Sequence, residues 1–187
     1  TMSPAEFIPI LEETGLIVEI GDWALREACM EARRLQLLGF PDLQMAVNFS
    51  ARQLREPRIA ARVQRILQET GLDPSFLVLE LTESMLLEDN DVVQAALWSL
   101  KALGLRLALD DFGTGYSSLS YLKHMPIDCL KVDQSFVRDI GKDAESEAIV
   151  RSVLAIGRCM KLHVVAEGVE TEQQFAFLSA NNCHAAQ

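Results

Sequence analysis

Residues 107–119 read Leu-Ala-Leu-Asp-Asp-Phe-Gly-Thr-Gly-Tyr-Ser-Ser-Leu. Apolar residues of strand character run directly into the adjacent carboxylates of Asp110 and Asp111, and a glycine-containing loop follows. Successive side chains of a strand point to opposite faces, so both carboxylates can face one side only if the strand ends between them and the chain turns. The stretch predicts a strand that ends in a functional site, with a plain turn and helix N-cap as the alternative interpretation.

The same arrangement recurs along the chain, which favours a site over a plain turn. Strands are expected over residues 43–49, 77–83 and 130–133. Another strand is expected to end at residue 110, and a last one to begin at residue 163. Helices are expected over residues 4–13, 20–38, 57–70, 90–103, 144–160 and 171–180, before a polar tail at 181–187. The polar groups at the strand ends are Asn48, Glu80, Asp110 with Asp111, Lys131 with Asp133, and Glu167. Strands that alternate with helices predict a parallel sheet covered by helices.

In α/β barrels the active site forms at the C-terminal ends of the strands, so these carboxylates, the amide and the lysine are expected to converge on one mouth. The runner-up fold is an open, doubly wound sheet of five strands, which also places its site at strand C-termini.

Composition limits the possible functions of the chain. The 187 residues are 49% hydrophobic and 24% charged, which is enough for one sizeable core. The net charge of −10 argues against binding DNA or RNA through phosphates. Its four cysteines lack zinc-site spacing, and there is no secretory signal or long apolar span. We expect a cytoplasmic domain with reduced thiols and no membrane segment of its own.

The carboxylates at the strand ends predict a metal site. Like charges packed together either acquire raised pKa values or bind cations. A ligand set made only of oxygen suits Mg²⁺ or Mn²⁺ rather than zinc. The pair Asp110 and Asp111 could hold two such ions close together, an arrangement that fits attack of water on a phosphodiester.

Successive motifs of the chain resemble the EAL family of bacterial cyclic di-GMP phosphodiesterases. The motifs are Asn48-Phe49-Ser50-x-x-Gln53, Glu80-Leu81-Thr82-Glu83, the loop from Asp110 to Ser118, Leu130-Lys131-Val132-Asp133, and Ala166-Glu167-Gly168-Val169-Glu170-Thr171. Each is weak alone, but their common order is highly specific. The resemblance implies a TIM-type (β/α)8 barrel, of which this chain represents about five strands, and hydrolysis of cyclic di-GMP to linear pGpG with two metal ions.

The resemblance also implies roles for individual residues. Asn48, Glu80 and Asp110 would ligate one metal ion, and Asp110 with Asp111 would hold the second, with Glu167 beside it. Lys131 would hydrogen-bond the nucleophilic water. Glu83 would brace the loop from Phe112 to Tyr116, which in the family connects the site to a homodimer interface. The remaining positions carried over are Gln53 as a substrate contact, Gln187 at the catalytic site, and Asp133, for which substrate contact and orientation of Lys131 both stay open.

The domain limits and the activity are further expectations. The glutamate of the Glu-Ala-Leu motif, a metal ligand, should lie upstream of residue 1, so we expect a single EAL-type domain over residues 1–187 that is truncated at both ends. Attached sensory or GGDEF-type domains are compatible with this reading. The alternatives to an active phosphodiesterase are a catalytically inactive cyclic di-GMP receptor and a regulatory dimerisation module.

Overall fold

The computed structural model describes residues 3–83, 85, 91–114 and 122–187. Its chain divides into two compact units, one made of residues 1–80 with 90–106, and the other of residues 81–89 with 107–187.

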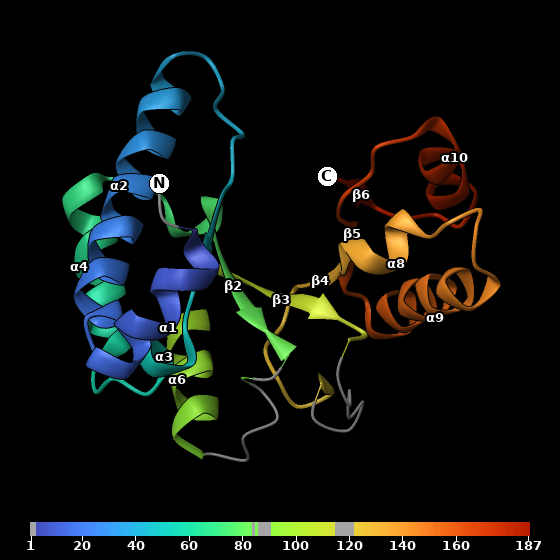
Figure 1. Cartoon of the computed structure of the whole chain (residues 1–187). Helices are drawn as coiled ribbons and strands as arrows, with labels where there is room; N and C mark the ends of the chain where they lie inside the picture. The colour runs from blue at the N-terminus through green and yellow to red at the C-terminus, as the bar shows by residue number, and fades with distance from the viewer. Residues whose placement is uncertain (1–2, 84, 86–90, 115–121) are drawn as a thin grey trace. The chain divides into compact units, whose positions relative to one another are not determined.

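The first unit is built mainly from helices around a parallel strand pair (Figure 1). Its elements are α1 (Pro4–Thr14), α2 (Ile17–Leu37), β1 (Met45–Asn48), α3 (Ala51–Leu54), α4 (Ile59–Thr70), η1 (Pro74–Phe76), β2 (Leu77–Thr82), whose last residues belong to the second unit, and α6 (Asp91–Lys101). Helix α1 begins as its sequence predicts, because Ser3 and Glu6 form a capping box with Pro4 at the first turn. It ends at Gly15, whose φ of 84° suits a residue without a side chain.

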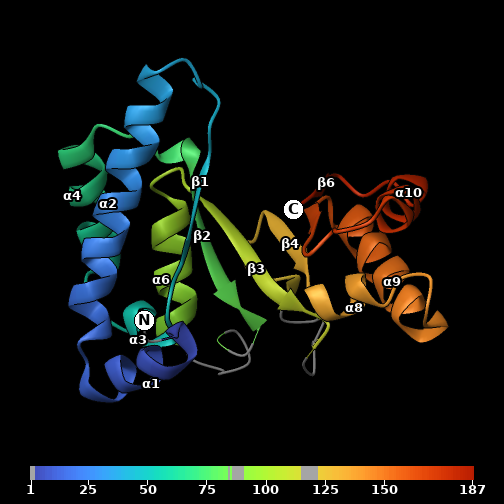
Figure 2. The ribbon, with the colours of Figure 1, turned by 45° about the horizontal axis from the view of Figure 1, so that its top comes forward.

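Helices α2 and α4 lie side by side in both views (Figure 1 and Figure 2). The apolar face of α2 buries Leu25 and Cys29, and α4 buries Val63 and Ile66. At the rim of this contact Arg62 pairs with Asp22, with 2.6 Å between Nη2 and Oδ2. The buried apolar side chains supply most of the stability of this unit, because surface ion pairs contribute little.

The second unit contains β3 (Arg106–Phe112), β4 (Cys129–Val132), β5 (His163–Ala166) and β6 (Ala185–Ala186), with helices α8 (Gln134–Arg138), α9 (Ala144–Met160) and α10 (Glu172–Ala180). Strands β3 to β6 pair in parallel, each with the next. Helix α9 packs on β4 and β5 (Figure 1). Gly157 allows this close packing, since a Cβ there would lie 2.2 Å from Cγ2 of Val164.

The strand order is β1-β2-β3-β4-β5-β6, the same as the order along the chain. Sequential parallel strands separated by helices are the arrangement of a TIM-type barrel, whereas a doubly wound sheet reverses its order at a switch point. The barrel-type topology expected from the sequence is therefore confirmed, and the doubly wound alternative is wrong.

Several boundaries differ from those expected. The strand predicted over 43–49 covers only Met45–Asn48, the helix predicted from residue 57 begins at Ile59, and the helix predicted over 90–103 is Asp91–Lys101, with Asn90 outside the described residues. Helix α3 was not expected, and the tail predicted to be merely polar contains β6. No helix within the described ranges is both long enough and apolar enough to cross a membrane.

Candidate active site

A backbone irregularity in β3 positions the carboxylates of Asp110 and Asp111. The pairing register of β3 with β4 shifts between Leu109 and Phe112, and Asp111 has a φ of 54°. Aspartate is one of the few residues other than glycine that adopt this left-handed conformation readily. The strand thus continues to Phe112, and the expectation that it ends between the two aspartates is wrong; a bulge turns the second side chain instead.

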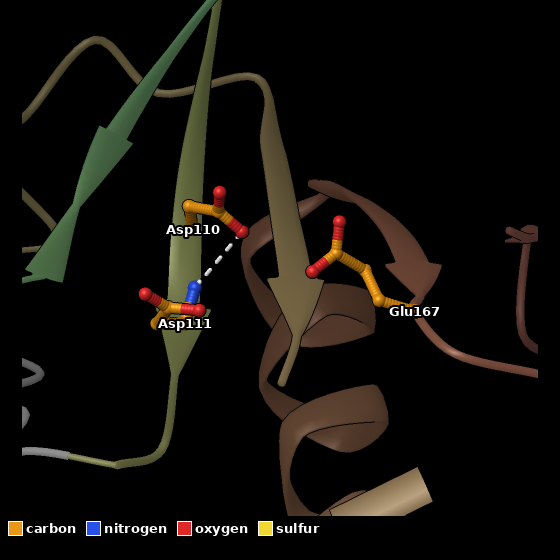
Figure 3. Close-up of side chains that lie close together, drawn as sticks. All are labelled: Asp110, Asp111 and Glu167. Atoms are coloured by element: carbon orange, nitrogen blue, oxygen red, sulfur yellow. Dashed lines mark hydrogen bonds between the residues drawn. The ribbon is translucent and has the colours of Figure 1, made fainter. Parts of the chain in front are cut away.

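Three carboxylates meet in the second unit. One oxygen each from Asp110, Asp111 and Glu167 can be chosen so that all lie within 4.8 Å of one another. Figure 3 shows the carboxylates of Asp110 and Glu167 directed toward each other, with Glu167 directly after β5. Asp110 is fixed by the backbone of its neighbour, because the N–H of Asp111 donates to its Oδ1 at 3.0 Å.

Lys131 of β4 lies between two of these acids. Its Nζ is 3.2 Å from Oδ1 of Asp110 and 2.6 Å from Oε1 of Glu167, and its side chain is only 7% exposed. A buried ammonium needs such partners, because losing its hydration is costly. The structure therefore brings together Asp110, Asp111, Lys131 and Glu167, which are four of the residues that the sequence predicted would converge.

The pKa of Asp111 is strongly perturbed. Burial, and next the negative charge of Asp110, raise the pKa of Asp111 from its ordinary 3.8 to about 6, with further contributions from Asp133 and Glu167. A side-chain hydrogen bond with Asp133 contributes to this rise in the pKa of Asp111. A cation that binds beside such a carboxyl group would stabilise its charged form, and the proton would be released to water.

Asp133 has a structural role at the start of α8. Its Oδ1 accepts from the backbone N–H of Ser135 at 2.9 Å and also contacts the Ser135 hydroxyl. Burial alone would raise the pKa of Asp133, but the hydrogen bonds with Ser135 and Asp111 and the charge of Arg138 together lower it. The Asp-x-Ser spacing signals such a cap, and sequence reasoning missed Ser135 as its partner. Substrate contact and orientation of Lys131 both remain predictions for Asp133.

Glu83 contacts the loop that follows β3. Glu83 is buried, and its Oε2 accepts from the backbone N–H of Gly113 at 3.3 Å. The predicted brace would extend as far as Tyr116, but residues 115–121 lie outside the described residues. The effect of this contact on the site is still a prediction.

Four further candidate residues are not part of the carboxylate cluster described above. In the first unit Asn48 and Glu80 lie opposite one another in the β1–β2 register. Gln53 is 3% exposed and completes the capping box of α3 with Ser50, whose backbone N–H donates to Oε1 of Gln53 at 3.0 Å. In the second unit the backbone N–H of Gln187 donates to the carbonyl of Ala166 at 2.8 Å. Their roles in metal binding, substrate contact and catalysis stay predictions.

Comparison with known proteins places this arrangement in a family. The family model described as EAL domain matches residues 1–187. The chain belongs to the EAL domain family. The barrel-type fold is also that of a solved structure, described as PaMucR phosphodiesterase in complex with c-di-GMP, at a TM-score of 0.94 and 44% identity, covering 100% of this chain and 75% of that chain.

Two further similarities bear on this EAL domain. It is 44% identical over 186 residues to the bifunctional diguanylate cyclase/cyclic di-GMP phosphodiesterase MucR of Pseudomonas aeruginosa, covering 100% of this chain and 27% of that protein. A structure of Klebsiella pneumoniae BlrP1 with manganese and cy-diGMP matches with a TM-score of 0.80 and 33% identity, covering 89% of this chain and 42% of that one. The chain spans between 22% and 32% of the length of the curated relatives it matches.

The donor atoms of this EAL domain fit a divalent cation. The clustered groups Asp110, Asp111 and Glu167 offer only carboxylate oxygens, the ligands that hard cations such as Mg²⁺ and Mn²⁺ prefer. None of the four free cysteines belongs to this cluster. Burial and the neighbouring negative charges raise the pKa of Asp111, and a bound cation would relieve the repulsion between these carboxylates.

Asp111→Asn is expected to stabilise the EAL domain in the absence of metal at neutral pH. Because the folded-state pKa of Asp111 is raised to about 6, the charged form disfavours folding above pH 6, and this cost disappears below its ordinary pKa of 3.8. Asparagine tolerates a positive φ and keeps a donor for Asp133. Thermal unfolding in EDTA should show a gain of roughly 1 kcal/mol at pH 7.5, after allowance for solvent screening, and none at pH 3.5.

The matched control is Asp139→Asn, which removes the same charge from a half-buried site beside Arg138, outside the carboxylate cluster. An equal gain in both variants at pH 7.5 would assign the effect to net charge and not to the cluster.

Proposed function

We propose that the protein hydrolyses one phosphodiester bond of cyclic di-GMP and releases linear pGpG. The observation that carries this proposal is the buried ammonium of Lys131 held between Asp110 and Glu167, beside the carboxylate of Asp111. Such a site offers cation ligands and a proton-handling group within one cluster, as phosphodiester hydrolysis requires. The substrate class is proposed because relatives that match the whole of this chain are named as phosphodiesterases or as complexes with cyclic di-GMP.

The proposed site would take two divalent ions, Mg²⁺ or Mn²⁺. Asp110, Asp111 and Glu167 are proposed as ligands from their clustering, and Asn48 and Glu80 from the family resemblance. When bound, such ions polarise the phosphoryl oxygens and make water nucleophilic at neutral pH.

The chain's own residues would position the reaction. Lys131 Nζ donates to Asp110 and Glu167, which fixes the directions of both carboxylates, and it would donate to or accept from the attacking water. Asp133 would orient Lys131 or contact the substrate. Glu83 would hold Gly113 at the start of the loop, whereas Gln53 and Gln187 are proposed at the substrate and the catalytic site on the resemblance alone.

The proposal is tested by product analysis with the full-length protein. Cyclic di-GMP with Mn²⁺ or Mg²⁺ should yield pGpG as the first product, separated by chromatography, and EDTA should stop the reaction. Binding of cyclic di-GMP without turnover would instead favour a catalytically inactive receptor. Turnover of cyclic di-AMP with none of cyclic di-GMP would contradict the substrate class. The absence of any nucleotide binding would favour the third alternative, a regulatory dimerisation module.

Assembly and location complete the proposal. The region after Asp111 is proposed to couple the site to a homodimer interface, as the family resemblance implies. We propose a cytoplasmic location, because all four cysteines are free thiols. Attached sensory or GGDEF-type domains stay a prediction.

A further inference from the structure

Helix α2 has a second apolar face in addition to the one that packs in the core. The core face carries Leu25, Cys29 and Ala32, which are at most 1% exposed. On the opposite side, large apolar side chains are between 39% and 73% exposed; they are Ile20, Trp23, Met30 and Leu37, and Leu16 at the N-cap is also exposed. Single exposed apolar residues are ordinary, but an apolar line along a 21-residue helix is not.

These residues follow the spacing of a coiled coil. We call the line Leu16, Ile20, Trp23, Glu27, Met30, Arg34 and Leu37 the α2 seam; its members are all exposed and are separated by four and three residues in turn. The residues of the α2 seam fall into two heptad positions. One position is wholly apolar, and the other carries Ile20, Glu27 and Arg34. A 4–3 repeat keeps one line facing a partner helix over several turns.

The contact of α2 with α4 uses a different side of the helix. Asp22 pairs with Arg62 of α4, and Arg26 pairs with Glu69 at 3.0 Å. Both α2 residues lie between the core face and the α2 seam, so packing on α4 leaves the seam exposed.

We propose that the α2 seam pairs with the α2 seam of a second copy of this chain, with the two helices antiparallel. The two-fold arrangement places Ile20 opposite Leu37 of the second copy, Trp23 opposite Arg34, and Glu27 opposite Met30. Each contact then occurs twice, as an isologous interface requires. Apolar pairs lie at both ends of the seam, and its charged members lie between them.

The charges of the α2 seam select the antiparallel direction. Parallel helices in register would place Glu27 opposite Glu27 and Arg34 opposite Arg34, and both like-charge contacts are unfavourable. The antiparallel pairing removes both contacts and brings Arg34 within one turn of Glu27 of the second copy. The seam is therefore complementary to itself in one direction only.

The Arg34 side chain is already oriented for its proposed partner. Its Nε and Nη2 donate to the carboxylate of Glu31 at 2.7 Å and 2.6 Å. This two-point contact uses the edge of the guanidinium and leaves its flat faces available for stacking. An arginine face against the Trp23 indole is a favourable cation–π contact, and it costs little ordering because the plane is already fixed.

The chain offers a matched pair of variants, because its two tryptophans are similarly exposed. Trp23 of the α2 seam is 60% exposed and Trp98 of α6 is 55% exposed. In sedimentation equilibrium of the full-length protein, Trp23→Lys should weaken self-association at least about tenfold, since it places a like charge opposite Arg34 of the second copy. Trp98→Lys should leave it unchanged. Identical association of Trp23→Lys and wild type would overturn the proposal.

Cross-linking tests whether the two paired α2 helices are antiparallel. It reports on the α2 seam independently of any other dimer interface. In a Cys159→Ser background, which removes the exposed native thiol, the double variant Ile20→Cys with Leu37→Cys should form a covalent dimer under mild oxidation. The two positions lie about 25 Å apart along one helix, so they cannot join within one chain. Neither single variant should cross-link. A covalent dimer of Ile20→Cys alone would show parallel helices, and a monomeric double variant would show no pairing; either result contradicts the proposal.

Discussion

Replacing Asp110 with alanine is expected to abolish measurable Mn²⁺ binding at the carboxylate cluster and to lower kcat/KM for cyclic di-GMP by roughly 10³-fold. Asp110 is 13% exposed in its side chain, and its Oδ1 accepts from both the N–H of Asp111 and Nζ of Lys131. Its loss removes a metal ligand and also leaves Lys131 with less negative charge around it. Calorimetric titration with Mn²⁺ measures the first effect, and chromatography of the nucleotide products measures the second.

The effect of Asp110 on folding can be separated from its effect on the metal. Asp110→Asn keeps an oxygen to accept from the N–H of Asp111 but lacks the negative charge, so it should fold like the wild type and still bind Mn²⁺ weakly. Asp139→Asn, at the half-buried site beside Arg138, should leave both binding and turnover unchanged. Unaltered Mn²⁺ affinity in Asp110→Ala would remove Asp110 from the ligand set.

The order of strands and helices could be predicted because the signals were local and strong. Apolar runs closed by glycine or by a polar group marked β2, β4 and β5, and helical spacing marked α2 and α9. Strand β6 had no such signal, since Ala185 and Ala186 have no strand preference; it forms because Gln187 donates to the carbonyl of Ala166 at the neighbouring strand. Helix α3 does have a signal, because Ser50-x-x-Gln53 is the pattern of a capping box as well as part of a family motif.

The candidate site shows the same division between local and tertiary information. The sequence predicted that Asp110, Asp111, Lys131 and Glu167 would converge, because parallel strands end at one edge. It could not predict how Lys131 pairs, since its contacts with Asp110 and Glu167 depend on the registers of three strands. It also could not predict the left-handed Asp111, because two adjacent aspartates fit a turn as well as a bulge.

The position of Lys131 favours a role in the chemical step over simple neutralisation of an acidic rim. A neutralising lysine would be expected near the surface with its ammonium in water, whereas Lys131 is buried and bonded to two acids of the cluster. From this position the amine can accept a proton from water, and the ammonium can donate to developing negative charge.

Lys131→Ala is therefore expected to lower kcat for cyclic di-GMP by roughly 10²-fold or more, the scale of a positioned acid–base group. KM should change far less, because the carboxylate ligands that hold the metal remain in place. Lys131→Met, which keeps the length of the buried side chain, should behave in the same way if the ammonium is what matters. Steady-state kinetics over a range of cyclic di-GMP concentrations separates kcat from KM.

Two controls distinguish a role of Lys131 in the chemical step from a role in binding. Mn²⁺ titration of Lys131→Met should show binding at least as tight as in the wild type, because the ammonium no longer competes for Asp110 and Glu167. The exposed Lys142, whose Nζ donates to the carbonyl of Arg138, supplies the matched variant Lys142→Met, which should keep wild-type kinetics. If Lys131→Met instead keeps a near-normal kcat with a much higher KM, Lys131 contributes only binding charge, and the attacking water must be deprotonated by another group.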